Sequence, residues 1–342
     1  MMKKIVITLI ILTILGGSAV AYFAWQYIYK NNIAKNKPTE VFIHSGDNFD
    51  DLINQLKTNE ILINPRSFRY LATKMNLPSH VYPGRYIINP GTNNKKLVTK
   101  FRSGAQAPLM ITFTSIRTKE KLASVLAQQI EIDSASIVER LYNNDYAKTF
   151  GFTAENFACM FIPNTYEMYW NISVDALFKR MHKEYRAFWN KSRKQKAAAL
   201  NLSPVEVCIL ASIVEKESAL TKEYPIIAGV YHNRLQRGIP LQADPTVVFA
   251  TGDFTIKRVL NKHLKIDSPY NTYKYRGLPP GPIGIPSTKV INGVLNKQDH
   301  KYLYFCAKDD FSGQHVFAKT LRQHNQNARL YRQALNRERI YK

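Results

Sequence analysis

The first thirty residues limit what this chain can be more than any other feature. The segment Ile5–Trp25 is an almost unbroken apolar run without a charged side chain. A helix needs roughly 20 residues to cross a hydrocarbon core of about 30 Å, so the run has a suitable length. The aromatic residues Trp25 and Tyr27 stand at its end, where a membrane interface favours them. The sequence therefore predicts a membrane anchor over residues 1–30, with a short stub before the helix.

A cleaved signal peptide is the alternative for this segment. Such peptides have a shorter apolar region followed by small residues, and Ser18–Ala21 offers weak spacing of that kind. The apolar run continues past this point into aromatic residues, which favours an uncleaved anchor. Lysines flank the run on both sides, so the positive-inside rule gives no orientation. A short stub with most of the 342 residues beyond the helix predicts that the bulk lies outside the cytoplasm.

The chain is strongly basic, with 48 Lys+Arg against 25 Asp+Glu and a formal charge of +23. Such a field favours polyanionic partners, which include nucleic acid, anionic lipid and acidic cell-wall polymers. Placement outside the cytoplasm argues against nucleic acid. The three cysteines Cys159, Cys208 and Cys306 form no CxxC motif or Cys/His cluster, so no zinc site is predicted.

Composition and periodicity divide the remainder into four segments of an α+β protein. Residues 31–39 read as a polar linker, and residues 40–104 as a small α+β module. The module's predicted order of strand, two helices and returning strand suggests a LysM-like subdomain, a type that binds N-acetylglucosamine polymers. A spacer without a ligand is the alternative. Residues 105–199 are predicted to be a connecting, mainly helical region, and residues 200–342 a mixed α+β domain that carries the candidate chemistry.

A strong helix start opens the last of these segments. Ser203 fits the N-cap, Pro204 fits the first helical position, and Glu206 completes a capping box. The residues that follow, Val205–Ala219, are apolar around most of the helical circumference. A helix of this kind is usually buried.

Two carboxylates interrupt this apolar helix, Glu215 and Glu217. On a helical wheel Glu217 lies among apolar residues, and it stands in the last turn near the negative end of the helix dipole. Both features disfavour ionisation and raise the pKa, as a general acid at neutral pH requires. The alternative is that both glutamates are solvated at a fraying helix end.

Polar and aromatic residues suited to sugar hydroxyls and ring faces follow this helix. Asp244 could instead begin a helix as its N-cap. A Pro/Gly-rich segment, Gly277–Ile283, predicts a rigid loop beside them. The candidate substrate-binding residues in this region are Asn233, Arg234, Gln242, Asp244, Thr246, Asn271 and Tyr273.

Five sequence blocks, in this order, resemble the YceG-like family. Each block is weak alone, but the ordered set is specific, and the resemblance extends over most of the chain. One departure is Asn164, where the family often has aspartate. The blocks are Ala211–Ser218, Asn233–Leu235, Leu241–Val247, Tyr270–Tyr273 and Gly277–Ile283.

The resemblance implies a single-pass protein of the bacterial inner (plasma) membrane with a periplasmic or external catalytic domain. The family's catalytic glutamate corresponds to Glu217, and its pattern adds Ser218 and His315 to the candidate substrate site. The implied activity is a lytic transglycosylase that cuts peptidoglycan glycan strands between N-acetylmuramic acid and N-acetylglucosamine and leaves a 1,6-anhydro end. It implies no cofactor or metal. The implied partners are glycan strands, membrane lipid and cell-wall synthesis enzymes, with no nucleic acid.

Two other functions stay open from the residues alone. Hydrolytic glycosidases usually use two carboxylates, and Asp244 could act as the second in a muramidase-type hydrolase. A non-catalytic scaffold that binds the wall would keep the basic surface and the LysM-like module without an apolar-flanked acid.

Overall fold

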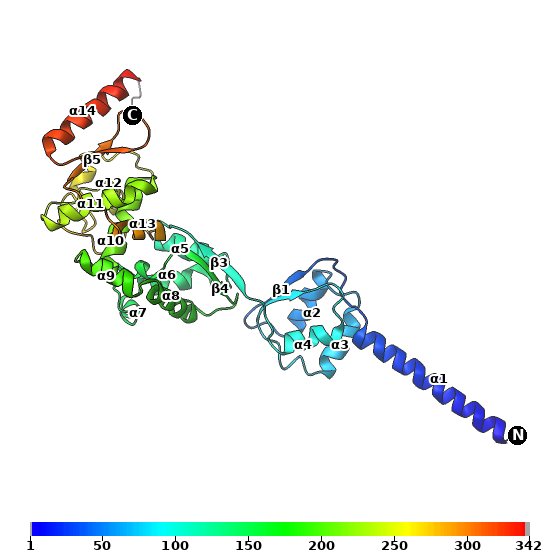
Figure 1. Cartoon of the computed structure of the whole chain (residues 1–342). Helices are drawn as coiled ribbons and strands as arrows, with labels where there is room; N and C mark the ends of the chain where they lie inside the picture. Colours follow the sequence, from blue (N-terminus) through cyan, green and yellow to red (C-terminus); the bar gives the residue numbers. More distant parts are fainter. Residues whose placement is uncertain (1, 339–342) are drawn as a thin grey trace. The chain divides into compact units, whose positions relative to one another are not determined.

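A computed structural model describes residues 2–338 of the chain. These residues form two compact units (Figure 1). The first extends to Ile111 and takes in Gln129–Glu131 and Tyr166–Ile172. The second comprises Thr112–Gln128, Ile132–Thr165 and the chain from Ser173 onward. The boundary expected at residues 199 and 200 is absent, because the helices on both sides of it belong to the second unit.

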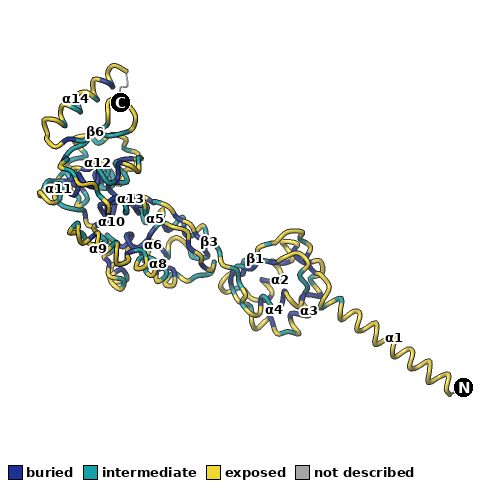
Figure 2. Tube along the Cα trace, viewed as in Figure 1, coloured by how far each residue is buried: buried dark blue, intermediate teal, exposed yellow. Residues whose placement is uncertain are grey.

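Helix α1, Met2–Tyr29, is the predicted apolar helix. It is exposed along its length, as Figure 2 shows, and none of its described residues is buried. Within residues 2–338 it is the one single helix that is long and apolar enough to cross a bilayer. Exposed apolar surface of this extent is costly in water, so α1 suits a lipid environment.

The first unit contains the predicted strand–helix–helix–strand module. Its two strands pair antiparallel, with Val41 opposite Tyr86. Asparagine side chains at positions 48, 64 and 93 cap its three helices, so each start follows from a local hydrogen bond. The elements are β1 (Thr39–Ile43), α2 (Phe49–Thr58), α3 (Pro65–Lys74), β2 (Gly84–Ile88) and α4 (Asn94–Arg102).

The start of the predicted linker at residues 31–39 lies inside this module. Asn32 and Ile33 are 4% and 3% exposed. The Asn32 amide donates to Asn94 Oδ1 at 2.7 Å, and the Asn94 amide donates to the Tyr27 carbonyl at 2.7 Å. Buried amides need such partners, and these bonds attach the end of α1 directly to the module.

Strands β3 (Leu109–Phe113) and β4 (Asn164–Met168) pair with each other, and their residues are divided between the two units. The remaining elements all belong to the second unit. Its α-helices are α5 (Lys119–Ala127), α6 (Ser134–Tyr142), α7 (Asn144–Lys148), α8 (Val174–Phe188), α9 (Lys191–Ala199), α10 (Pro204–Glu217), α11 (Tyr224–Gln236), α12 (Asp244–Thr251), α13 (Thr288–Leu295) and α14 (Leu321–Arg337). The antiparallel strands β5 (Tyr304–Ala307) and β6 (His315–Ala318) and the 3₁₀ turns η1 (Phe157–Met160), η2 (Thr221–Glu223) and η3 (His263–Lys265) complete it.

Helix α10 lies at the centre of the second unit. The predicted capping box is present, since Ser203 and Glu206 exchange hydrogen bonds at its start. Eight consecutive residues, Val207–Val214, are buried, and α11 and α13 pack against the helix. The helix ends at Glu217 because Ser218 takes an extended conformation, with φ −142° and ψ 141°. Glu217 is therefore held at the end of a rigid, buried element.

The Gly/Pro loop supports α10 from one side. The Ile283 amide donates to Ser212 Oγ at 3.0 Å, which joins the loop to a polar group inside the helix. A Cβ on Gly281 would lie 2.2 Å from the Glu155 carbonyl oxygen, so only glycine fits at that position. The rigid loop expected from its composition is thus a packed wall beside the helix.

Candidate active site

Glu217 lies at the junction of two cavities of about 300 Å³ each. Both cavities are lined by Glu217 and Asp244. The first, which we call the Arg234 cavity, is lined further by Tyr231, Arg234, Gln242, Tyr273, Tyr304 and His324. The second, the Arg117 cavity, is lined further by Arg117, Lys216, Phe249, Phe254 and Lys257. Together they form an open site on both sides of one half-buried carboxylate.

The environment of Glu217 favours its protonated form. Burial raises the pKa of this carboxyl to about 7, and the nearby charge of Asp244 adds to the effect. The hydrogen bond from Tyr231 and the charge of Arg234 act in the opposite direction but are outweighed. The apolar helix therefore has the consequence predicted from its sequence, a carboxyl that can carry a proton near neutral pH.

A tyrosine fixes the orientation of this carboxyl. Tyr231 Oη donates to Glu217 Oε1 at 2.5 Å. Burial raises the pKa of Tyr231 well above its ordinary value, so the phenol stays a donor. No hydrogen bond to Oε2 is found among residues 2–338.

Four predicted substrate-binding residues do line the Arg234 cavity: Arg234, Gln242, Asp244 and Tyr273. Tyr273 Oη donates to Asp244 Oδ1 at 2.5 Å, and Asp244 is exposed. Asp244 is the first residue of α12 and does not cap the helix, since Ala243 holds the cap position. Gln242 has φ +50°, a conformation that non-glycine residues adopt rarely. This turn directs residues 242 and 244 to the same cavity.

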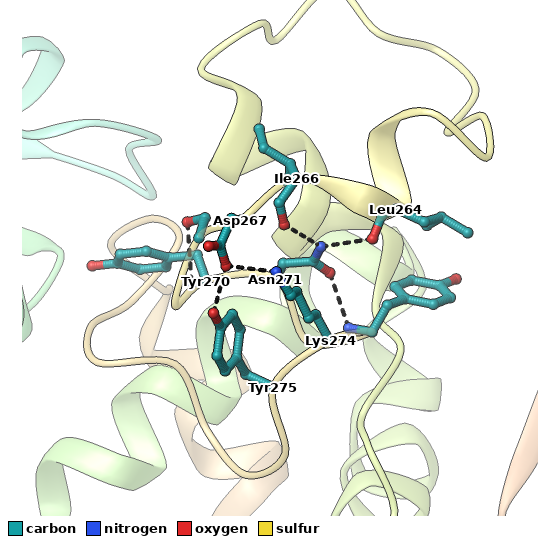
Figure 3. A network of polar contacts seen from close by, with 9 residues as sticks. Leu264, Ile266, Asp267, Tyr270, Asn271, Lys274 and Tyr275 are labelled. Atoms are coloured by element: carbon teal, nitrogen blue, oxygen red, sulfur yellow. Dashed lines mark hydrogen bonds and ion pairs between the residues drawn. The ribbon is translucent and has the colours of Figure 1, made fainter.

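Three other predicted ligands are structural. Thr246 is fully buried, and its hydroxyl donates to the Ala243 carbonyl at 2.6 Å. The Asn233 amide donates to the carbonyls of His300 and Tyr302 at 2.8 and 3.0 Å. Asn271 is fully buried, and its amide donates to the Leu264 and Ile266 carbonyls at 2.9 Å each, as Figure 3 shows. The amide nitrogens of Asn233 and Asn271 and the hydroxyl of Thr246 are therefore used within the protein.

Ser218 and His315 were expected at the substrate site, but in the structure they form hydrogen bonds within the protein. Both hydrogen-bond the buried carboxylate of Glu223: Ser218 Oγ donates at 2.7 Å, and the His315 amide donates at 2.8 Å. The His315 ring nitrogen Nδ1 lies 2.8 Å from the same carboxylate. Burial alone would raise the pKa of Glu223, but these hydrogen bonds outweigh it and lower the pKa. The cluster fixes the turn that follows Glu217 and lines neither cavity.

The residue list drawn from the sequence omitted Tyr231, Tyr304, His324 and Arg117. Tyr231 could have been found, because it stands three residues before Arg234 on a mostly apolar helix and therefore shares its face. A tyrosine on a buried helix needs a partner for its hydroxyl, which is a further signal. Arg117 and Tyr304 come from distant segments, and only the tertiary structure brings them to Glu217.

Glu215 faces away from the two cavities. Ser115 Oγ donates to its Oε2 at 2.6 Å, and the Ser287 amide donates to its Oε1 at 3.0 Å. It therefore joins α10 to the loop after β3 and to the start of α13.

A glutamine at position 215 keeps an acceptor for Ser287, so we expect Glu215→Gln to be a mild change. It should lower the free energy of unfolding by about 1 kcal/mol and keep most of the turnover. Chemical denaturation and turnover on purified cell wall would measure both effects. A loss of activity as large as that of a Glu217 variant would contradict the supporting role of Glu215.

Among residues 2–338, no group of three or more His, Cys, Asp or Glu side chains could hold a metal ion. The acidic group that lines the site with Glu217, Asp244, accepts a hydrogen bond from Tyr273.

The chain belongs to the YceG-like family, whose model matches residues 41–330. It is 30% identical over 336 residues to the endolytic murein transglycosylase of Bacillus subtilis (strain 168), over 93% of this chain and 91% of that protein. It is 25% identical to the protein of the same name from Streptococcus pneumoniae serotype 2 (strain D39), over 91% of this chain and 62% of that longer protein. A crystal structure of a putative YceG-like protein from Listeria monocytogenes superposes with a TM-score of 0.56 at 26% identity, and covers 85% of this chain and 99% of its own.

Proposed function

We propose that this chain is a membrane-anchored lytic transglycosylase that cuts peptidoglycan glycan strands internally, with Glu217 as its acid. The observation that carries the proposal is the carboxyl at the end of α10, whose pKa burial raises to about 7 in an open site. Its relatives' names, endolytic murein transglycosylase, support the reaction and the substrate. A non-catalytic scaffold would not need a protonated acid in a cavity.

In the proposed reaction Glu217 protonates the oxygen of the β-1,4 bond that follows N-acetylmuramic acid, and this bond breaks at C1. The 6-hydroxyl of the same muramyl ring attacks C1 and forms the 1,6-anhydro ring. Glu217, now a carboxylate, takes the proton of that hydroxyl and is restored. The tyrosine at position 231 keeps the carboxyl oriented through both transfers. No water is consumed, so a second carboxylate to activate water is unnecessary.

The alternative reaction is hydrolysis with Asp244 as a second carboxylate. It is favoured by one observation, that Asp244 and Glu217 line the same two cavities. Tyr273, whose hydroxyl donates to Asp244, holds Asp244 on the exposed side of the site.

Mass spectrometry of the products separates the two reactions. Purified sacculi, digested with the full-length protein in detergent, should yield fragments with anhydro-muramyl ends, one water lighter than the products of hydrolysis. Reducing muramyl ends in their place would assign the muramidase reaction. No cleavage of sacculi or of nascent glycan would contradict both and leave the scaffold function.

The acid role predicts a defined pH dependence. Glu217 must hold a proton at the start of the reaction, and its pKa is raised from 4.5 to about 7. Activity should therefore fall as pH rises through about 7, by roughly tenfold per pH unit well above it. Initial rates between pH 5 and 9, at saturating substrate, would measure this. A rate that is constant from pH 6 to 9 would contradict the assignment.

We further propose that α1 anchors the protein in the bacterial plasma membrane, with both units on the external side. The exposed apolar surface of α1 supports this, as does its direct attachment to the module through Asn94. The full chain should sediment with membranes, and a chain that begins at Lys30 should not. Protease added outside spheroplasts should digest the part beyond Lys30. Protection of that part, or a mature N-terminus near residue 22, would contradict this arrangement.

A further inference from the structure

The Arg117 cavity is lined by two cations that form no ion pair with an acidic side chain among the described residues 2–338. Arg117 and Lys216 both line it beside Glu217. The Arg117 guanidinium is exposed and stacks over the Phe254 ring at 4.8 Å. No hydrogen bond or ion pair joins either cation to another group among residues 2–338. The exposed Lys257 lines the same cavity.

The geometry of α10 explains why Lys216 lines the Arg117 cavity without an ion pair to Glu215. Successive residues on α10 are turned by about 100°, so Glu215, Lys216 and Glu217 face different sides. Both oxygens of Glu215 are used by Ser115 and Ser287, so it forms no ion pair with its neighbour. Burial lowers the pKa of Lys216; Glu215 opposes this shift, and the charge of Arg117 adds to it. Two like charges are thus held together at the cost of desolvation and repulsion, which a bound anion would offset.

We infer that Arg117 and Lys216 form a carboxylate-binding subsite beside the acid, which holds a carboxylate of the peptide stem on the glycan strand. This inference rests on the proposed function. The amino-sugar rings of peptidoglycan carry no charge, and the negative charges lie on the peptide stems. Each stem is attached to the muramyl ring, the ring whose C1 reacts at Glu217. An anion site next to Glu217 is therefore within reach of the stem of the reacting sugar.

The adjoining cavity fits the rest of such a stem. It has a volume of about 420 Å³, and it shares Arg117, Phe249 and Phe254 with the Arg117 cavity. Its other walls include the apolar surfaces of Tyr270 and Ile285 and, at separate positions, the charged residues Lys119, Glu120 and Glu155. Aromatic and aliphatic walls suit the small apolar side chains of alanine-containing peptides. Arg117, at the boundary between the two cavities, is placed to bind the charged group between them.

The two cations should act on substrate binding and not on the chemical step. The charges that shift the pKa of Glu217 are those of Asp244 and Arg234, and Lys216 is not among them. Removal of one charge from a charge-assisted contact should raise KM about tenfold and leave kcat and the pH profile unchanged. Only substrates that carry peptide carboxylates should show this loss.

The test compares Lys216→Gln and Arg117→Gln with the wild-type full chain on two glycans of equal length. One glycan carries peptide stems with free carboxylates, and the other carries the same stems with their carboxylates amidated. Lys216→Arg keeps the charge and should restore KM, and Lys191→Gln removes an exposed lysine of α9 as a matched control. Since Arg117 is exposed, its variant should fold even if Lys216→Gln does not.

The expected result is a rise of about tenfold in KM on the glycan with free stem carboxylates and little change on the amidated one. Equal rises in KM on both glycans would overturn the subsite. So would a rise in KM that depends on a lipid-linked pyrophosphate end of the glycan and not on its stems. No turnover of any glycan by the wild type would contradict the proposed function itself.

Discussion

Turnover of peptidoglycan is expected to fall by about a thousandfold when Glu217 is replaced by glutamine. An amide cannot give up a proton, and general acid–base catalysis contributes about 10²–10⁴-fold to a rate. The amide oxygen can still accept the hydrogen bond from Tyr231, so the geometry of the site should persist. The loss should appear in kcat with KM nearly unchanged, because the two groups have similar size. Release of soluble fragments from purified sacculi measures it.

The stability of the same variant provides the control. The pKa of Glu217 is raised from 4.5 to about 7 in the folded state. The wild type therefore loses stability as pH rises from 4.5 to about 7, and this loss is complete above pH 7. Glutamine does not ionise, so the variant should gain up to about 3 kcal/mol relative to wild type above pH 7 and little below pH 4.5. Glu139→Gln, at an exposed position on α6, should change neither rate nor stability. Wild-type turnover by Glu217→Gln would remove Glu217 from the mechanism.

The environment of Glu217 could be predicted because its causes are local. The capping box at Ser203 begins α10, and the apolar composition of the helix buries it. A carboxylate on the apolar side of such a helix is buried with it, as Glu217 is. Helix α1 and the order of elements in the small module also depend on local sequence, so the predictions for them agree with the structure.

The partners of the acid could not be predicted, because they depend on which distant segments meet. Asn271 and Thr246 are polar residues in a turn-rich part of the sequence, as residues that bind a sugar often are. In the structure they hold the backbone of neighbouring turns, a role that the same residue types fill equally well. Arg117 shows the converse, since nothing near it in sequence marks it as part of the site. Its place beside Lys216 follows only from the fold.

The segment boundaries failed for a related reason. Strands β3 and β4 are separated by 50 residues of sequence and pair with each other. The chain therefore returns to the first unit at Tyr166–Ile172 before it completes the second. Such a return leaves no signal in the sequence, because neither strand is unusual in composition.

Replacement of Arg234 should destabilise the protein more than it alters the chemistry. Its guanidinium is 7% exposed and donates to the carbonyls of Leu303, Pro240 and Leu241 at 2.7, 3.1 and 2.8 Å. Arg234→Gln would leave most of these buried acceptors without a donor. Each such group costs about 1–3 kcal/mol, so we expect a loss of 3 kcal/mol or more. Denaturant unfolding of the chain that begins at Lys30 measures it.

Two comparisons separate this structural role from the substrate binding first expected of Arg234. Arg237→Gln removes an exposed arginine one turn later on the chain and should cost less than about 0.5 kcal/mol. Arg234→Lys keeps a positive charge near Glu217 but lacks the planar fork that reaches three carbonyls, so it should also be destabilised. If Arg234→Lys were as stable as wild type and only KM rose, the residue would be a substrate ligand. If both Arg234 variants unfold more readily while Arg237→Gln does not, the guanidinium holds the turn at residues 240–242 that presents Asp244 to the site.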